Sequence, residues 1–134
     1  MSNKAQLRAT KNRYVNIRNN KNTELKGLQD DKRRLEDAIR DAEDIKNDFD
    51  SEKNKYDSIE IQNNEWKGKT RKDSDNKKRD LDEAIDDYKT KYKEIIEQMN
   101  KDLEELETKI SNVETDIREL TNRIDSIDRQ LASD

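Results

Sequence analysis

Residues 96–131 decide the fold, and they read IEQMNKDLEELETKISNVETDIRELTNRIDSIDRQL. Apolar residues recur in this stretch at spacings of three and four without interruption: Ile96, Met99, Leu103, Leu106, Ile110, Val113, Ile117, Leu120, Ile124, Ile127 and Leu131. Two apolar positions in every seven are typical of a coiled-coil seam, in which a narrow stripe faces a neighbouring helix. The pattern therefore predicts a long helix whose seam residues bind another helix.

The stripe continues upstream with a drift of one residue, through Leu81, Ile85, Tyr88, Tyr92 and Ile95. A straight helix accommodates such a drift because 3.6 residues per turn do not divide evenly into seven. The sequence therefore predicts one helix over residues 76–132.

The first half of the chain carries a sparser stripe. One heptad position is apolar except at Lys21, and it holds Leu7, Tyr14, Leu28, Leu35, Ala42, Phe49 and Tyr56. Other apolar residues are expected to flank this position, namely Ile17, Leu25, Ile39 and Ile45. The pattern predicts a second helix over residues 5–58.

Residues 60–74, EIQNNEWKGKTRKDS, are the one segment without periodicity. Asn and Gly tolerate turn conformations, so the chain is expected to reverse here. The sequence predicts an all-α fold, an antiparallel two-helix hairpin that forms a single domain over residues 1–134. Reversal at this segment pairs residues whose numbers sum to about 131, which sets Leu7 against Ile124, Tyr14 against Ile117, Leu28 against Leu103 and Leu35 against Ile96.

Composition supports a thin seam rather than a globular core. Only 28% of residues are hydrophobic and 46% are charged, and the chain has no proline to break a helix. Residues 1–28 carry a net charge of +6 and residues 106–134 one of -3, so these segments attract each other in the hairpin. Residues 29–65 and 80–105 each carry -6, which suggests that the middle of the chain meets a basic partner surface.

The residue types present exclude several classes of function. The chain has no histidine and no cysteine, so it lacks the usual zinc ligands and the nucleophile–histidine pairs of hydrolases. We expect no catalytic residues, no metal, no cofactor and no enzymatic activity. A net charge of -4 argues against general nucleic-acid binding. With no apolar stretch long enough for a membrane span or a cleaved signal peptide, the expected location is the cytoplasm.

Trp66 is the only tryptophan, and it lies in the most polar segment of the chain. With Lys67 and Gly68 it forms a W-x-G sequence between two predicted helices. This arrangement resembles the WXG superfamily of type VII (ESX) secretion, and it is most similar to the YwqH-like family of Firmicutes. Members of that family are commonly encoded beside LXG-domain toxins.

The resemblance implies a non-enzymatic partner that pairs with the helical N-terminal region of an LXG toxin and helps to present it for type VII secretion. Trp66 and Gly68 are the motif residues carried over, as a recognition tip. The export signal of such systems is an aromatic residue followed four residues later by an acid. Tyr56 and Glu60 have this spacing, whereas no aromatic residue follows Tyr92. The resemblance also implies export without a cleaved signal peptide.

Three alternatives stay open at this point. The partner that completes the seam is either another helical protein, such as an LXG toxin, or a second copy of the chain. A structural coiled-coil spacer or self-dimerising scaffold, with no role in secretion, fits the same heptads. A nucleic-acid binder acting through the basic N-terminal segment would bind DNA in a salt-sensitive manner.

Overall fold

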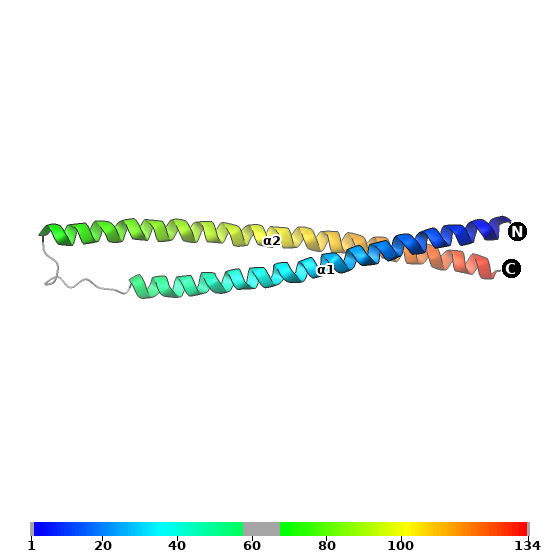
Figure 1. Ribbon diagram of the computed structural model, residues 1–134, viewed down its shortest axis with the longest axis horizontal. Helices are drawn as coiled ribbons and strands as arrows, with labels where there is room; N and C mark the ends of the chain where they lie inside the picture. The colour runs from blue at the N-terminus through cyan, green and yellow to red at the C-terminus, as the bar shows by residue number, and fades with distance from the viewer. Residues whose placement is uncertain (1, 58–67, 134) are drawn as a thin grey trace. The chain divides into compact units, whose positions relative to one another are not determined.

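The computed structural model describes residues 2–57 and 68–133, with side chains described throughout these ranges except at residues 2, 57, 68–71 and 74. It consists of two α-helices, α1 (Ser2–Asp57) and α2 (Gly68–Ala132) (Figure 1). The all-α helical hairpin predicted from the two stripes is confirmed, since residues of α1 contact residues of α2 in antiparallel order. None of the described helical segments is long and apolar enough to cross a bilayer.

Helix α2 begins eight residues earlier than the predicted helix, at Gly68 rather than Asn76. The residues after Gly68 have no apolar periodicity, and for that reason they were expected in the turn. Loss of periodicity removes a seam, but it does not break a helix when proline is absent and lysine and arginine are frequent. The rest of the predicted turn, residues 60–67, lies outside the described residues.

The chain divides into two units. Unit 1 comprises Met1–Glu36 and Asp102–Asp134, and unit 2 comprises Asp37–Lys101. Unit 1 contains most of the buried core of the described chain. Its buried side chains, each between 4% and 9% exposed, all come from the seam of α2: Ile110, Val113, Leu120, Ile124 and Ile127.

About half of the seam positions of α1 are basic residues, which the apolar pattern does not predict. Its first heptad position carries the stripe already described, from Leu7 to Tyr56. Its second position is buried or half-buried at every repeat and holds Lys4, Lys11, Arg18, Leu25, Lys32, Ile39, Lys46 and Lys53. Lysine and arginine can lie at such positions because their aliphatic stems cover apolar residues while the charged ends reach water or an acid.

In unit 1 these basic residues reach polar groups on α2. Lys11 Nζ lies 2.6 Å from Asp128 Oδ1, and Arg18 Nη1 donates a hydrogen bond of 3.3 Å to Thr121 Oγ1. Two further ion pairs join the helices, Lys21–Asp116 at 3.5 Å and Lys32–Glu107 at 3.9 Å. Exposed pairs of this kind contribute about 0–1 kcal/mol each. Polar groups at seam positions mainly fix the register, at some cost in stability.

The observed register differs from the predicted one by about one heptad. The ion pairs between the helices join residues whose numbers sum to 137 or 139 in both units, as in Lys21 with Asp116, Lys11 with Asp128 and Asp50 with Lys89. Near the end of α1 the sum falls to 134, for Tyr56 with Lys78. The predicted pairs, such as Tyr14 with Ile117, are therefore wrong. A heptad pattern looks the same after a shift of seven, so the stripes cannot distinguish the two registers. The polar contacts between the helices do, such as Lys11 with Asp128 and Asp50 with Lys89.

Candidate protein-interaction surface

The eleven predicted seam residues of α2 all lie within the hairpin. Six are buried, namely Ile96, Ile110, Val113, Leu120, Ile124 and Ile127, and the other five are half-buried. In this conformation they pack against the chain's own first helix. Binding of a separate partner through these residues stays a prediction, and it would require α1 to move away from α2.

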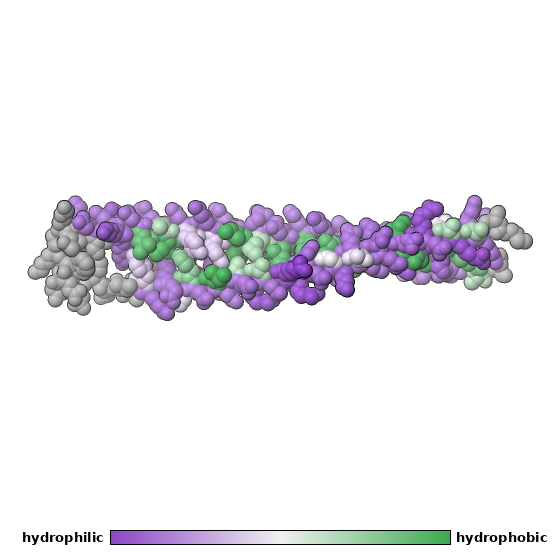
Figure 2. Space-filling view, viewed as in Figure 1, coloured by the Kyte–Doolittle hydropathy of each residue, from purple (hydrophilic) through white to green (hydrophobic). Residues whose placement is uncertain are grey.

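A different set of apolar side chains is open to solvent. Among the described residues, five large hydrophobic side chains are more than one third exposed, and four of them belong to unit 2. These four define the apolar strip: Ile45 on α1 and Leu81, Tyr88 and Ile95 on α2. Figure 2 shows the strip's setting, with hydrophobic residues of unit 2 exposed between the two helices and hydrophilic residues along both margins.

Three members of the strip recur every seven residues on α2, at Leu81, Tyr88 and Ile95. Each directly precedes a half-buried or buried residue of the α2 interface, at positions 82, 89 and 96. Successive residues of an α-helix are about 100° apart, so the strip lies beside the seam and on one side of it. It forms a second heptad line, parallel to the first.

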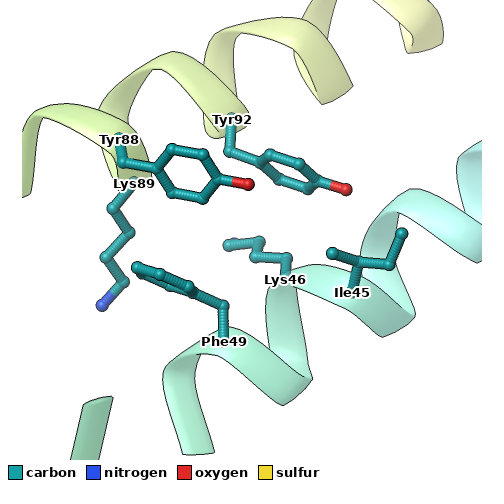
Figure 3. A pocket seen from close by; sticks show the side chains of 6 residues that line it. All are labelled: Ile45, Lys46, Phe49, Tyr88, Lys89 and Tyr92. Atoms are coloured by element: carbon teal, nitrogen blue, oxygen red, sulfur yellow. The ribbon is translucent and has the colours of Figure 1, made fainter. Parts of the chain in front are cut away.

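Ile45 extends the strip onto α1. Ile45 and Phe49 from α1 line one shallow depression together with Tyr88 and Tyr92 from α2, and Lys46 and Lys89 lie beside them (Figure 3). The ring centroids of Phe49 and Tyr88 are 5.0 Å apart. Those of Tyr88 and Tyr92 are 5.9 Å apart. The aromatic rings therefore pack against one another and leave their outer faces available to a ligand or a partner.

The other side of unit 2 is charged. Lys46 and Lys89 also line a second depression, whose remaining residues are Asp50, Asp86, Thr90 and Lys93. Lys89 Nζ forms an ion pair of 3.1 Å with Asp50 Oδ1. The two lysines therefore lie between a face rich in aromatic and aliphatic carbon and a face of ionic groups. The large exposed hydrophobic side chains, Ile45 and Tyr88, line the first face.

An acid precedes each residue of the apolar strip along the chain. Asp44 precedes Ile45, Asp80 precedes Leu81, Asp87 precedes Tyr88 and Glu94 precedes Ile95. All four acids are exposed. Successive residues are about 100° apart, so these acids lie on the side of each helix that faces away from the interface. The side chains beside the strip are those three and four residues away, namely Ala84, Lys91 and Gln98 on α2 and Asp41 and Asp48 on α1.

The apolar pattern predicts that Leu81, Tyr88 and Ile95 lie in the seam and Ile45 at its flank, whereas the structure exposes all four. The signal that could have separated them is the pair Ile95–Ile96. Two consecutive residues cannot both face one narrow seam. Counting back from Ile96 by threes and fours reaches Tyr92, Lys89 and Ile85, which leaves Leu81, Tyr88 and Ile95 on the adjoining line.

The motif residues are only partly described. Trp66 and Glu60 lie outside the described residues, and Gly68 is the first residue of α2. Tyr56 lies near the end of α1, where Lys78 Nζ is 5.7 Å from the centroid of its ring. The recognition tip and the export spacing are therefore still predictions from the sequence.

Acidic residues are frequent, but within the described parts of α1 and α2 no group of three or more metal-ligating side chains converges. The arrangement can bind a helix through apolar contacts and surrounding charge. It gathers no nucleophile and base in a sheltered site among the side chains described.

These features define the class of the protein as an all-α antiparallel helical hairpin with a coiled-coil seam. The chain belongs to the YwqH-like family, whose sequence pattern matches residues 6–129. The match covers nearly all of α1 and α2, which agrees with the family resemblance carried by Trp66 and Gly68. No curated protein and no solved structure is significantly similar to the chain.

Proposed function

We propose that this protein is a non-enzymatic binding partner of another helical protein, and that the partner is the N-terminal helical region of an LXG-type toxin destined for type VII secretion. The proposal combines membership of the YwqH-like family with one structural observation. The hairpin leaves an apolar strip exposed in unit 2, at Ile45, Leu81, Tyr88 and Ile95. A second protein that covers this strip removes it from water.

Binding, rather than catalysis, also agrees with the weak core. The described chain has no side chain that is less than 2% exposed. A two-helix hairpin buries each helix on one side only, and helices of this kind commonly assemble into bundles of four. A toxin that supplies a helix pair would complete such a bundle. The toxin in turn would be kept soluble in the cytoplasm until export.

The WXG-like turn would supply the contact with the secretion machine. In this proposal Trp66 and Gly68 form a recognition tip, since aromatic residues often anchor interfaces. Tyr56 and Glu60 provide the spacing of an export signal, unless the partner carries its own. The protein would then be exported with its partner and without a cleaved signal peptide.

The experiment is co-expression with the products of neighbouring genes, followed by affinity purification through a tag on this chain. We expect one LXG-type protein to co-purify at a fixed ratio in size-exclusion chromatography with light scattering. Recovery of the 16.0 kDa chain as a homodimer that binds none of these products would support the self-dimerising scaffold instead. Secretion of the toxin at an unchanged level when Trp66 is replaced by alanine would dismiss the recognition tip.

A further inference from the structure

We propose that the apolar strip of unit 2 is a self-association surface, on which a second copy of the chain docks face to face. In this dimer α1 of one copy lies over α2 of the other, and a twofold axis runs along the helices of unit 2. The second copy covers the strip for as long as no other protein occupies it. The inference goes beyond the proposed function and holds without it.

Unit 2 leaves apolar surface uncovered. Among the described side chains of unit 1, Ile17 at 38% is the one large hydrophobic residue that is exposed. In unit 2, Ile45, Tyr88 and Ile95 are each about half exposed, and the ring of Tyr88 packs against that of Phe49. An apolar surface that is contiguous and rimmed by polar groups marks an interaction site. The strip therefore has the properties of an interface that the hairpin alone does not complete.

Two lysines lie beside the aromatic rings, but they leave the centre of the strip apolar. Lys46 and Lys89 line the charged depression on the other side of unit 2 as well as the aromatic one. Lys89 forms its ion pair with Asp50, which lines the charged depression. A lysine stem can cover apolar residues in this way while its charged end reaches an acid. The charges that a docked protein meets are therefore those at the margins of the strip.

The two margins carry opposite charge. On α1 the margin holds Asp41 and Asp48, and on α2 it holds Ala84, Lys91 and Gln98. All of these side chains are exposed. Within the described parts of the chain, Asp48 and Lys91 form no ion pair. An acidic margin and a basic margin on one face are complementary to the opposite margins of a second copy.

Asp48 and Lys91 lie at the same level along unit 2. The ion pair between Asp50 and Lys89 sets the level of one helix against the other. Asp48 is two residues before Asp50, and Lys91 is two residues after Lys89. In antiparallel helices both steps run in the same direction, about 3 Å each at 1.5 Å per residue. The two side chains therefore lie across the strip from each other, one on each margin.

A twofold axis along the helices keeps every residue at its level and brings α1 of each copy over α2 of the other. It places Asp48 of each copy beside Lys91 of the other, which gives two ion pairs between the copies. It also places Ile45 of each copy beside Ile95 of the other, because by the same count their levels differ by about 1.5 Å. Apolar contact and charge pairing therefore occur together in this arrangement.

The alternative axis, across the helices, sets α1 over α1 and α2 over α2. Asp41, Asp48 and Glu52 of one copy would then face the same acids of the other. Like charges placed against each other cost binding energy, and the axis along the helices avoids this cost. Acids such as Asp44 and Asp87 lie on the sides of the helices that face away from the strip, so they do not decide the orientation.

The dimer should be weak, because four exposed side chains form its apolar part and small interfaces are typical of transient association. We expect a dissociation constant of about 100 µM at about 0.15 M salt, so that the chain is monomeric in the low-micromolar range. The experiment is sedimentation equilibrium of the full chain from about 10 µM to about 1 mM. The average mass should rise from near the 16.0 kDa of the monomer toward twice that value.

Glutamine variants test the apolar contact without changing the net charge. Tyr88→Gln and Ile95→Gln should each weaken self-association by about tenfold. Ile17→Gln is the matched control, because it removes an exposed isoleucine of unit 1, and it should dimerise like the wild type. Circular dichroism should show unchanged helix content in all three variants, since the replaced side chains are exposed.

An exchange of charges tests the orientation. Asp48→Lys and Lys91→Asp should each weaken self-association by about tenfold, since each sets like charges side by side. The double variant with both changes should dimerise like the wild type. An equimolar mixture of the two single variants should associate more tightly than either variant alone. Asp44→Lys is the control, because it makes the same change of charge on the far side of α1, and it should have little effect.

Three results overturn the inference: a wild type that stays monomeric up to about 1 mM, equal dimerisation of Ile95→Gln and Ile17→Gln, or a double charge variant as weak as the single ones. Stronger self-association of Asp48→Lys alone would also overturn it, since that result fits α1 packed over α1. A helical partner would then be the better candidate for the strip.

The outcome is separable from that of the proposed function. If the wild type dimerises as expected while no toxin co-purifies with it, the self-association surface stands and the secretion role fails. If a toxin co-purifies while the wild type alone stays monomeric up to about 1 mM, the partner role stands and the self-association surface is wrong.

Discussion

Ile95 and Ile96 are consecutive residues of α2, yet Ile96 is 9% exposed in the hairpin seam and Ile95 is 54% exposed on the apolar strip. One peptide step separates a residue that holds the hairpin together from one that is free to meet another protein. This division follows from the 100° turn between neighbours in a helix. It also separates two kinds of mutation, those that affect folding and those that affect binding.

Stability should depend on the seam and hardly on the strip. Ile124 is 4% exposed, so Ile124→Ala should lower the free energy of unfolding by about 2–3 kcal/mol through lost burial and a residual cavity. Ile95→Ala should change it by no more than about 0.5 kcal/mol. Urea denaturation followed by circular dichroism measures both. Equal losses in the two variants would contradict the assignment of Ile95 to an exposed line.

The register can be tested by cross-linking, because the chain has no native cysteine. Arg18 and Thr121 are joined by a hydrogen bond of 3.3 Å through the long arginine side chain, so a short bifunctional thiol reagent should link the pair Arg18→Cys with Thr121→Cys within one chain. The control pair, Arg18→Cys with Glu114→Cys, moves the second cysteine back by one heptad, about 10 Å along α2. Mass spectrometry should find the first pair cross-linked in the monomer. Preferential cross-linking of the control pair would restore the register first predicted from the sequence.

Gly27 lowers the stability of α1 without an evident packing role. It lies within continuous helix, and a Cβ atom added there would meet nothing within 4 Å. Gly27→Ala should therefore raise the free energy of unfolding by about 0.5–1 kcal/mol, because alanine loses less conformational entropy in a helix. A rise in the thermal midpoint without a change in helix content would agree. A fall would indicate a contact at Gly27 that the hairpin alone does not contain.

The basic residues in the α1 seam should specify the register of the hairpin and add little to its free energy of unfolding. Lys32 Nζ is 3.9 Å from Glu107 Oε1, and both side chains are partly exposed, so their ion pair contributes little. Lys32→Leu should raise the free energy of unfolding by about 1 kcal/mol through added apolar burial. Lys32→Gln serves as the control, since it removes the charge without adding apolar surface. If both variants are destabilised alike, the ion pair contributes more to the free energy of unfolding than its geometry suggests.

Much of the fold could be predicted from the sequence because the local spacing of apolar residues is enough to identify a coiled-coil seam. The eleven residues from Ile96 to Leu131 repeat at threes and fours, and all of them lie in the hairpin. The register could not be obtained in this way, since stripes with a period of seven match again after each heptad. The register is marked by polar contacts such as Lys11 with Asp128 and Asp50 with Lys89, which a pattern of apolar residues does not contain.

The interaction surface could be predicted less well than the fold. The spacing identifies Tyr88 and Ile95 as part of an apolar stripe. Because the spacing drifts by one residue, this stripe covers two adjacent lines of the helix surface, and only one of them can face α1. The position of Lys89 in the interface, where it pairs with Asp50, decides which line is covered. A lysine at a seam position is not visible to a rule that follows apolar residues alone.

Hydrogen exchange tests the central claim, that a helical partner binds the hairpin through unit 2. The measurement compares the free protein with the complex that co-purifies after co-expression. Backbone amides of residues 41–52 and 81–96 should exchange more slowly in the complex, because a docked helix stabilises these parts of α1 and α2 against local opening. Residues 110–127 should change less, since their seam is already covered. Protection confined to residues 110–127, or exchange that is the same in the free and bound protein, would contradict the account.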